Sequence, residues 1–421
     1  MLCGLLGQKL GHSYSPQIHA ALADYDYRLF EVEPEDLAGF LNRTPFQGLN
    51  VTIPYKKAVL PYCAGLSEAA RAMGSVNTLV RQKDGTLWGD NTDWVGFCAI
   101  LDSLAIPVQG KKALVLGSGG AGVMAAWVLQ NRGAQVITVS RGGPDNYENL
   151  DRHRDAALLV NATPVGMYPH TEGCPVDPGR FPRLEGVLDL IYNPAGTRLL
   201  LRARDLGIPC RNGLRMLVGQ AKRAAELFTG QSLEDALTQE ITARLAWQTA
   251  NVILIGMPGS GKTTVGQALA RRLGRDFADG DQAVEEATGQ TIPQIFQTGG
   301  EAAFRQEETK VLSRLGKASG LVIATGGGCV TRPENRDLLR QNGIVIFLER
   351  PLDRLSRDGR PLSLGADLEA MYRRRLPLYR QFADATVKNT GCPEETAAVI
   401  EEVSYEISRM QWAQSESVGH P

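Results

Sequence analysis

Short apolar runs alternate with amphipathic stretches along most of the chain, a pattern typical of strands that alternate with helices. In the first quarter, the pattern predicts strands at residues 2–6, 27–32, 48–52, 77–81 and 86–89, and helices at residues 16–22 and 34–41. The first of these helices has a proline near its start, where the missing N–H does no harm.

From about residue 108 the pattern becomes a series of βαβ units, with strands predicted at residues 113–116, 135–139, 158–161, 186–189 and 209–211. Such alternation favours a parallel sheet covered by helices on both faces. Two closing helices are predicted at residues 214–228 and 233–247, and Ser232 is a candidate cap for the second. A new βα series starts at residue 251 without a Gly/Ser-rich or Pro-rich linker, so we expect two α/β halves joined closely near residues 248–250.

Composition narrows the class of protein. With 421 residues, 43% apolar and 22% charged, the chain is an ordinary globular one of roughly three domains. A net charge of −1 gives no general attraction to nucleic acid or anionic membranes, and we expect neither a membrane span nor a signal peptide. The seven scattered cysteines form no Cys-x-x-Cys pair and indicate reduced thiols in the cytoplasm, and the five histidines lack zinc-site spacing. We expect the polar tail, residues 414–421, to be disordered.

Two glycine-rich loops each follow a predicted buried strand and open a helix. Residues 117–122 read Gly-Ser-Gly-Gly-Ala-Gly, and residues 256–263 read Gly-Met-Pro-Gly-Ser-Gly-Lys-Thr. The first pattern is typical of dinucleotide binding and the second of nucleoside triphosphate binding. The chain is therefore expected to combine redox chemistry with phosphoryl transfer on separate domains.

The end of the strand after the first loop indicates which dinucleotide is bound. The candidate pyrophosphate-binding residues are Gly117, Gly119, Gly120, Ala121 and Gly122. An NAD enzyme carries an acidic residue at the end of the next strand, where this chain has Ser140 and Arg141. A guanidinium pairs with a 2′-phosphate that a carboxylate would repel, so we predict NADP(H), with Arg141 as the selector. The alternative is that Arg141 is only a solvated residue at a strand end.

Six further segments resemble the signature segments of shikimate dehydrogenase over residues 1–230. They are Gly-His-Ser-Tyr-Ser-Pro-Gln-Ile-His at 11–19, Gly-Leu-Asn-Val-Thr-Ile-Pro-Tyr-Lys at 48–56, Val-Asn-Thr at 76–78, Gly-Asp-Asn-Thr-Asp at 89–93, Asn-Ala-Thr-Pro-Val-Gly-Met at 161–167 and Met-Leu-Val-Gly-Gln at 216–220. The resemblance implies a two-lobe α/β unit. A substrate-binding lobe at 1–105 would be completed by helices within 214–248, and a Rossmann NADP-binding domain would occupy 106–213.

Reduction of a ketone needs a proton for the developing alkoxide, and a lysine beside a carboxylate can supply it. By resemblance, Lys56 and Asp93 form this catalytic pair, and the expected substrate is 3-dehydroshikimate. The resemblance also implies that the substrate is bound by Ser13, Ser15, Thr52, Asn77, Tyr192 and Gln220, and that Asn161, Thr163 and Gly213 lie on the nicotinamide side. His12 and His19 are expected to be structural.

The second loop predicts a nucleotide site. Backbone N–H groups of Gly259, Ser260 and Gly261 would cradle phosphates, and Lys262 would meet the β- and γ-oxygens. Thr263 would bind Mg²⁺, and Thr264 is a further candidate for binding the nucleotide. By itself the loop leaves small-molecule kinases, GTPases and motor ATPases open.

Downstream segments resemble shikimate kinase, in order, from residue 251 to about 390. They are Phe-Ala-Asp-Gly-Asp at 277–281, Gly-Glu-Ala-Ala-Phe-Arg at 300–305, Thr-Gly-Gly-Gly at 325–328, Arg-Pro-Leu at 360–362 and Arg-Leu-Pro-Leu-Tyr at 375–379. The resemblance implies a P-loop, NMP-kinase-like parallel α/β domain at 249–412 that uses ATP and Mg²⁺, followed by a tail at 413–421.

The same resemblance implies roles in phosphoryl transfer. Asp279 would support Mg²⁺ with Thr263, Asp281 would bind and orient the acceptor hydroxyl, and Arg360 would close over the phosphates. Arg305 and Arg375 would clamp the substrate carboxylate, because a guanidinium pairs with it bidentately. Gly326, Gly327 and Gly328 would let the substrate lie against bare backbone. Phe296 and Phe304 are equally compatible with plain core packing.

These features together predict a bifunctional enzyme that reduces 3-dehydroshikimate to shikimate and then phosphorylates shikimate. The expected partners are these small molecules, and the oligomeric state stays open. Three alternatives remain: a quinate/shikimate dehydrogenase working oxidatively with NAD, a regulator in which one half only senses ligand, and a kinase for another sugar acid.

Overall fold

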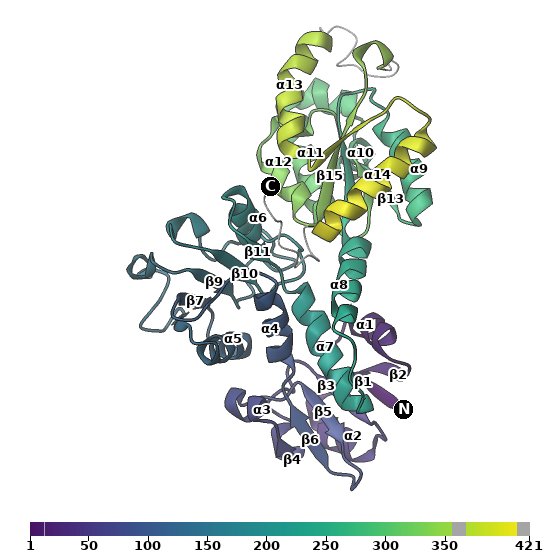
Figure 1. The fold of residues 1–421 in the computed structure, drawn as a ribbon. Coiled ribbons are helices and arrows are strands. Elements are labelled where there is room, and N and C mark those ends of the chain that lie inside the picture. Colours follow the sequence, from purple (N-terminus) through teal and green to yellow (C-terminus); the bar gives the residue numbers. More distant parts are fainter. Residues whose placement is uncertain (12, 356–367, 411–421) are drawn as a thin grey trace.

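The computed structural model describes residues 1–11, 13–355 and 368–410. The predicted tail at 413–421 therefore lies outside the described residues. Three separate sheets organise the chain in sequence order, one in each of the three lobes seen in Figure 1.

The first sheet is mixed and has the strand order β2-β1-β3-β5-β6-β4. Its strands are β1 (Leu2–Gly7), β2 (Asp26–Glu31), β3 (Gly48–Val51), β4 (Cys63–Leu66), β5 (Thr78–Arg81) and β6 (Leu87–Asp90). The helices are α1 (Ser15–Leu22), α2 (Leu37–Arg43) and α3 (Glu68–Met73). β1 runs parallel to β2 and β3, whereas β5 is antiparallel to β3 and β6. The apolar pattern predicts all of these strands except β4.

The second sheet is entirely parallel, with the order β11-β10-β9-β7-β8. Its strands are β7 (Lys112–Leu116), β8 (Gln135–Val139), β9 (Leu158–Asn161), β10 (Gly186–Asp189) and β11 (Cys210–Arg211). Helices α4 (Asp93–Asp102), α5 (Gly120–Asn131) and α6 (Arg198–Asp205) accompany it. Alternate residues of β7 enter two different apolar clusters, so both faces of the sheet are covered, as predicted for a βαβ series.

Two helices close the first half of the chain. α7 (Leu214–Thr229) packs against α4 and α1, and α8 (Ala236–Thr249) extends away from it toward the third sheet (Figure 1). The prediction that Ser232 caps the second helix is wrong: α8 begins after Asp235, and its N-terminal N–H groups receive no side-chain cap. The loop before α8 is longer than the apolar pattern suggests.

The third sheet is also parallel, with the order β13-β14-β12-β15-β16. Its strands are β12 (Asn251–Ile255), β13 (Phe277–Asp279), β14 (Val322–Ala324), β15 (Gly343–Glu349) and β16 (Ala385–Lys388). The helices are α9 (Lys262–Leu273), α10 (Gly280–Thr288), α11 (Ile292–Lys317), α12 (Glu334–Arg340), α13 (Leu368–Phe382) and α14 (Pro393–Ser408). One face packs on α9 and α14, and the other on α11, α12 and α13.

The junction between the halves is short and tightly held. A single residue, Ala250, separates the end of α8 from the first residue of β12. Arg275 donates hydrogen bonds to the carbonyl oxygens of Trp247 (2.6 Å) and Ala250 (2.7 Å), and its guanidinium lies 4.3 Å from the centre of the Trp247 ring. The third sheet is therefore fixed to the end of α8 rather than tethered by a flexible linker.

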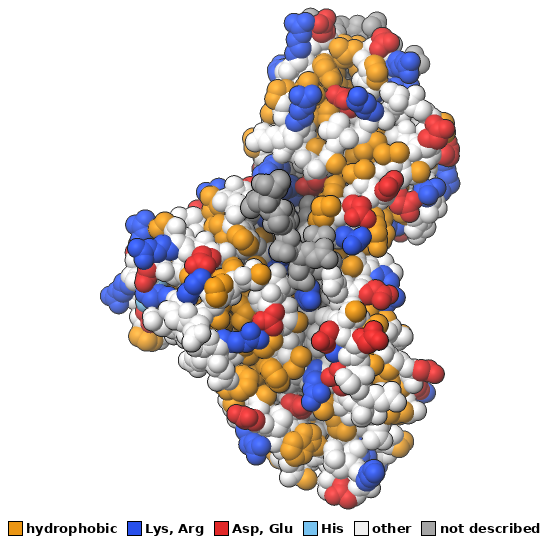
Figure 2. All heavy atoms as spheres, in the orientation of Figure 1, with side chains coloured by type: hydrophobic (Ala, Val, Ile, Leu, Met, Phe, Trp, Pro, Cys, Tyr) orange, Lys and Arg blue, Asp and Glu red, His pale blue; other side chains and the backbone are white. Residues whose placement is uncertain are grey.

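The surface carries mixed charge. On the face in Figure 2, basic and acidic side chains are interspersed over all three lobes. Among the described residues, no helix has the length and apolar character needed to cross a membrane.

Candidate active sites

The first candidate site is a cavity of about 230 Å³ between the first sheet, α4 and α7. Its lining includes Ser13, Ser15, Thr52, Lys56, Asn77, Asp93, Tyr192, Gly213 and Gln220, all of which the sequence singles out. These residues span more than 200 positions of the chain, so the fold gathers them from distant segments. Sequence reasoning missed Tyr14, Asn50 and Met216, which line the same cavity. Asn50 could have been found, because it precedes Thr52 by two residues on a strand and so shares its face.

Lys56 and Asp93 form an ion pair inside this cavity, with 2.7 Å between Nζ and Oδ2. Asp93 is the first residue of α4, where a carboxylate also benefits from the helix dipole. Its Oδ1 accepts a hydrogen bond from Nδ2 of Asn77 (2.9 Å), and Oδ1 of Asn77 accepts from the Thr92 N–H (2.7 Å). This chain of bonds fixes the carboxylate, and the lysine side chain stays 35% exposed toward the cavity.

His19 lies behind the cavity rather than in it. Its ring stacks on Tyr27 at 4.0 Å between centroids, and Nδ1 is 2.5 Å from the Tyr25 hydroxyl. Burial lowers the pKa of His19 to about 3, so the ring is neutral at physiological pH. This agrees with a structural role, as the sequence suggests. His12 lies outside the described residues.

The first glycine loop has the shape that a pyrophosphate needs. Gly117 has a φ of 105°, which favours glycine, and a Cβ on Gly122 would lie 2.0 Å from the carbonyl oxygen of Gly117. A Cβ on Gly119 or Gly120 would meet no protein atom within 4 Å. The loop thus presents open backbone at the start of α5, where N–H groups and the helix dipole favour phosphate.

Arg141 lies in a turn directly after β8. Ser140 follows the last residue of β8, and its N–H donates to the carbonyl oxygen of Asp145 (3.0 Å), which closes a turn. Arg141 in this turn is exposed and forms no ion pair with a carboxylate of the described residues. Its guanidinium is therefore available to a ligand phosphate.

Asn161 has a different environment from the one the resemblance implies. Its side chain is fully buried and donates to Oδ1 of Asp189 (3.0 Å), while its Oδ1 accepts from the Thr163 hydroxyl (2.7 Å) and N–H (3.1 Å). Both polar groups of the amide are used within the protein. Contact of Asn161 with the nicotinamide stays a prediction, and the structure gives it a role in holding the loop after β9.

The second candidate site is a larger cavity of about 510 Å³ at the carboxyl ends of the third sheet. Lys262, Thr263, Asp279, Asp281, Arg305, Gly326, Gly327, Gly328 and Arg375 line it, as the sequence predicts. Phe296 and Phe304 line it too, although Phe304 is also buried in an apolar cluster. Arg360 lies outside the described residues.

The phosphate loop of this site depends on glycine at three positions. Gly256, Gly259 and Gly261 have φ angles of 151°, 82° and 93°, which other residues rarely adopt. Lys262 begins α9, and its Nζ donates to the carbonyl oxygens of Gly256 and Met257, each at 3.0 Å. The ammonium is thereby held over the loop before any nucleotide binds.

Thr263 and Asp279 fit a magnesium site. The Thr263 hydroxyl donates to Oδ2 of Asp279 at 2.8 Å, so two hard oxygen ligands lie together at the start of α9 and the end of β13. The described residues contain no cluster of three or more metal-ligating side chains. The Thr263–Asp279 pair suits Mg²⁺, which is commonly held by one or two protein groups with phosphate and water completing the shell.

The triple glycine lets several side chains approach the backbone. A Cβ on Gly326 would lie 2.4 Å from Oε1 of Glu308 and 2.6 Å from Oδ1 of Asp281, one on Gly327 2.7 Å from the Pro258 ring, and one on Gly328 1.9 Å from Nη2 of Arg305. Any larger residue would displace these groups. The glycines therefore leave room for the carboxylates of Glu308 and Asp281 and for the guanidinium of Arg305.

Two buried arginines, Arg305 and Arg375, line this cavity. Nη1 of Arg305 pairs with Glu308 at 2.7 Å, and Nη2 pairs with Glu301 at 3.1 Å. Burial raises the pKa of Glu308. Arg375 is 5% exposed, donates to the carbonyl oxygen of Gly327 at 3.2 Å, and has a buried Nε without a hydrogen-bond partner among the described residues. Because Arg375 lines the cavity, its guanidinium fits a carboxylate ligand there.

Sequence reasoning missed two residues of this site: Glu308, the buried partner of Arg305, and Arg350, an arginine near the phosphate loop. Glu308 follows Arg305 by one helical turn, but its spacing alone does not separate a buried partner from a surface ion pair. Arg350 follows β15, and its Nη1 would lie 3.4 Å from a Cβ on Gly261. Arg350 could have been suspected as a site residue, because it lies at the carboxyl end of a strand beside β12, where ligands bind in parallel sheets.

In comparisons with known proteins, the two halves of the chain match two different families. The model of the shikimate dehydrogenase substrate-binding domain matches residues 5–79, and the shikimate kinase model matches residues 258–407. The chain is 36% identical over 256 residues to shikimate dehydrogenase (NADP(+)) of Clostridium beijerinckii, which covers 56% of this chain and 94% of the relative. It is 49% identical over 159 residues to shikimate kinase of Burkholderia lata, which covers 36% of this chain and 86% of the relative.

The chain belongs to both families. The crystal structure of shikimate dehydrogenase from Thermus thermophilus with NADP(H) and shikimate is also similar, with a TM-score of 0.52 and 34% identity over 57% of this chain and 97% of that one. The protein is thus a bifunctional shikimate-pathway enzyme, with a Rossmann-containing shikimate dehydrogenase followed by a P-loop shikimate kinase. Its cofactors are NADP(H), and ATP with Mg²⁺.

Proposed function

We propose that the two cavities perform consecutive reactions, reduction of 3-dehydroshikimate and phosphorylation of the shikimate that results, with the residues described above in distinct roles. The domain limits that we propose are 1–105 with helices within 214–248 for the substrate-binding lobe, 106–213 for the NADP-binding domain and 249–412 for the kinase. The seven cysteines of the sequence, all free where the structure describes them, support a cytoplasmic location.

In the dehydrogenase, Lys56 donates the proton that the carbonyl oxygen needs as negative charge develops on it, and Asp93 orients the lysine. Bound NADPH supplies the hydride. The 2.7 Å ion pair and the hydrogen bond from Asn77 to Asp93 support this assignment, because they hold both groups at the cavity wall. Ser13 and Ser15 bind the substrate carboxylate, and Thr52, Tyr192 and Gln220 bind its other oxygens.

In the kinase, Asp281 accepts a hydrogen bond from the acceptor hydroxyl and orients it for attack, while Arg305 and Arg375 hold the substrate carboxylate. Bound Mg-ATP supplies the phosphoryl group. Thr263 and Asp279 would hold the metal, and Lys262 would neutralise charge on the phosphates. The guanidinium of Arg375, which lines this cavity, is the group that best supports an anionic substrate there.

The observation that carries the proposal is the presence, in one chain, of two separate cavities: one contains the Lys56–Asp93 ion pair, and the other joins the second phosphate loop to the Arg305 and Arg375 side chains. The test is a coupled assay on the purified protein with wild type, Lys56→Ala and Lys262→Ala. NADPH consumption should require 3-dehydroshikimate, and ADP release should require shikimate. Each substitution should lower only its own activity, by about 10²-fold or more.

The alternatives give different results in the same assay. Oxidation of quinate with NAD, faster than reduction of 3-dehydroshikimate with NADPH, would favour a catabolic dehydrogenase. Binding of 3-dehydroshikimate without turnover would favour a sensor, and ADP release with another sugar acid in preference to shikimate would favour a different kinase.

A further inference from the structure

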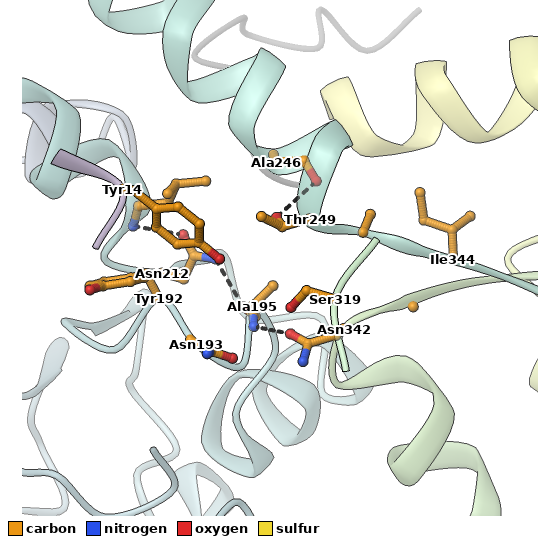
Figure 3. A pocket seen from close by; sticks show the side chains of 13 residues that line it. Tyr14, Tyr192, Asn193, Ala195, Asn212, Ala246, Thr249, Ser319, Asn342 and Ile344 are labelled. Carbon is orange, nitrogen blue, oxygen red and sulfur yellow. Dashed lines mark hydrogen bonds between the residues drawn. The ribbon is translucent and has the colours of Figure 1, made fainter. Parts of the chain in front are cut away.

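One loop of the dehydrogenase contacts both its own substrate cavity and the kinase domain. Tyr192 lines the dehydrogenase substrate cavity, and three residues later the same loop reaches the kinase domain at Ala195 and Gly196. Figure 3 shows Tyr192, Asn193 and Ala195 on one side of this contact and Asn342 of the kinase on the other.

The kinase contributes two hydrogen bonds to this loop. Oδ1 of Asn342 accepts from the Ala195 N–H at 2.8 Å, and the carbonyl oxygen of Gln341 accepts from the Gly196 N–H at 2.7 Å. Asn342 is 7% exposed, and its Nδ2 donates to the carbonyl oxygen of Lys317 at 3.3 Å, at the end of α11. The amide of Asn342 therefore bridges the kinase core and the dehydrogenase loop.

The dehydrogenase holds the loop from its other side. Nδ2 of Asn212 donates to the carbonyl oxygen of Ala195 at 2.9 Å, and the Tyr168 N–H donates to the carbonyl oxygen of Asn193 at 3.1 Å. The N–H groups of Ala195 and Gly196 depend on the kinase for their partners. Both N–H groups would lose these bonds if the kinase moved away.

A small cavity of about 20 Å³, room for about one water molecule, adjoins this contact and is lined by Tyr14, Tyr192, Ala195, Asn342 and Ile344. The two hydrogen bonds from Ala195 and Gly196 therefore join the loop to the kinase beside a space that side chains do not fill. The kinase segment is itself anchored nearby, since Arg336 forms a two-point ion pair with Asp205 at 2.9 and 3.0 Å.

We propose that Asn342, a residue of the kinase domain, is a positioning residue for the dehydrogenase: it fixes the 192–196 loop and thereby the Tyr192 side chain in the substrate cavity. The proposal rests on the substrate-binding role of Tyr192 given above. If Asn342 has this role, the dehydrogenase site is complete only when the kinase domain is docked against the 192–196 loop.

The test compares four full-length proteins: wild type, Asn342→Leu, Gln341→Ala and Tyr192→Phe. Leucine keeps the branched shape of the Asn342 side chain, although it is larger, and removes the acceptor for Ala195. Gln341→Ala is the matched control, because among the described residues the Gln341 side chain donates its hydrogen bond to Leu338 within the kinase, and the backbone acceptor for Gly196 remains. Steady-state kinetics of both activities and hydrogen exchange of the Ala195 and Gly196 amides are measured on each protein.

Loss of one such hydrogen bond should raise the KM for 3-dehydroshikimate in Asn342→Leu about 3- to 10-fold. The kcat, the KM for NADPH and both kinase KM values should stay within twofold of wild type, and exchange at Ala195 should speed up. Gln341→Ala should match wild type in all of these. If Asn342→Leu does not fold, Asn342→Ala tests the same bond.

Two results would overturn the proposal in different ways. If Tyr192→Phe raises the KM for 3-dehydroshikimate but Asn342→Leu leaves it within twofold of wild type, the kinase does not position the loop. If Tyr192→Phe itself has no effect, the assigned role of Tyr192 fails and the inference fails with it. Equal losses in Asn342→Leu and Gln341→Ala would indicate a general effect on folding and would also refute it.

Discussion

Replacing Gly328 by alanine should disable the kinase and leave the dehydrogenase intact. The added Cβ would lie 1.9 Å from Nη2 of Arg305, 2.3 Å from its Cζ and 2.6 Å from its Nη1. The backbone of Gly328, with φ −105° and ψ 0°, is accessible to alanine. The effect therefore comes from the clash with the guanidinium and not from backbone strain.

The size of the effect follows from how far Arg305 must move. Ordinary contact begins at 3.4 Å, so a group 1.9 Å away has to retreat by 1.5 Å. The side chain is only 8% exposed and is held by Glu308 at 2.7 Å and Glu301 at 3.1 Å, so the retreat breaks these pairs as well. A misplacement of about 1 Å can lower a rate about 10²-fold, and we expect kcat/KM for shikimate to fall by at least this factor, or about 2.7 kcal/mol.

The assay is shikimate-dependent ADP release, with NADPH oxidation by the same sample as the internal control for folding. Gly142→Ala is a matched control, because a Cβ there meets no atom within 4 Å and the position lies far from the kinase sheet in sequence. A kinase kcat/KM within threefold of wild type in Gly328→Ala would refute the argument that the glycine positions Arg305. Loss of both activities would refute the claim that the effect is local.

Three further predictions concern the Rossmann domain. Arg141→Asp should lower the ratio of kcat/KM with NADPH to that with NADH by about 10-fold or more, because a carboxylate repels the 2′-phosphate; an unchanged ratio in steady-state assays would exclude Arg141 as the selector. Burial raises the pKa of Asp189 from 3.8 to about 7, so the folded protein holds a proton that the unfolded chain releases between these values. The free energy of unfolding should therefore fall as pH rises from about 4 to 7, by about 4 kcal/mol at most, and Asp189→Asn should flatten this slope in urea titrations. Gly122→Ala places a Cβ 2.0 Å from the Gly117 carbonyl oxygen and should raise the KM for NADPH while kinase activity persists.

The strands of the second sheet could be predicted closely. Strands β8, β9 and β10 have the predicted bounds, and β9 and β10 are buried along their whole length, as expected for parallel strands covered on both faces. In the third sheet, the start of β12 at residue 251 was predicted. β4 escaped prediction, because its Cys-Ala-Gly-Leu sequence is short and only partly buried. The end of α7 has a local signal, because Gly230 adopts the left-handed conformation directly after it, whereas the start of α8 receives no side-chain cap, so the prediction for Ser232 was wrong.

The residues of the candidate sites also fall into those with a local sequence signal and those without one. Lys56, Asp93, Lys262 and Asp281 lie in local motifs and could be proposed from the sequence: Lys262 from the phosphate-loop pattern, and the other three from the resemblance to known families. Their roles stay predictions. Contacts between distant segments leave no local signal, and the bond from Ala195 to Asn342 joins residues 147 positions apart. The environment of Asn161 is likewise visible only in three dimensions, because Asp189, its partner, lies on the neighbouring strand.

Because α8 passes directly into β12 through Ala250, the number of residues in α8 determines how the kinase domain is rotated relative to the dehydrogenase. Adding one residue within α8 would turn everything beyond it by about 100° and advance it by about 1.5 Å. Such a change would carry Asn342 and Arg336 away from the loop and from Asp205 even though no contacting residue had been altered. Length variation should therefore be tolerated in the loop between α7 and α8 far better than in α8 itself.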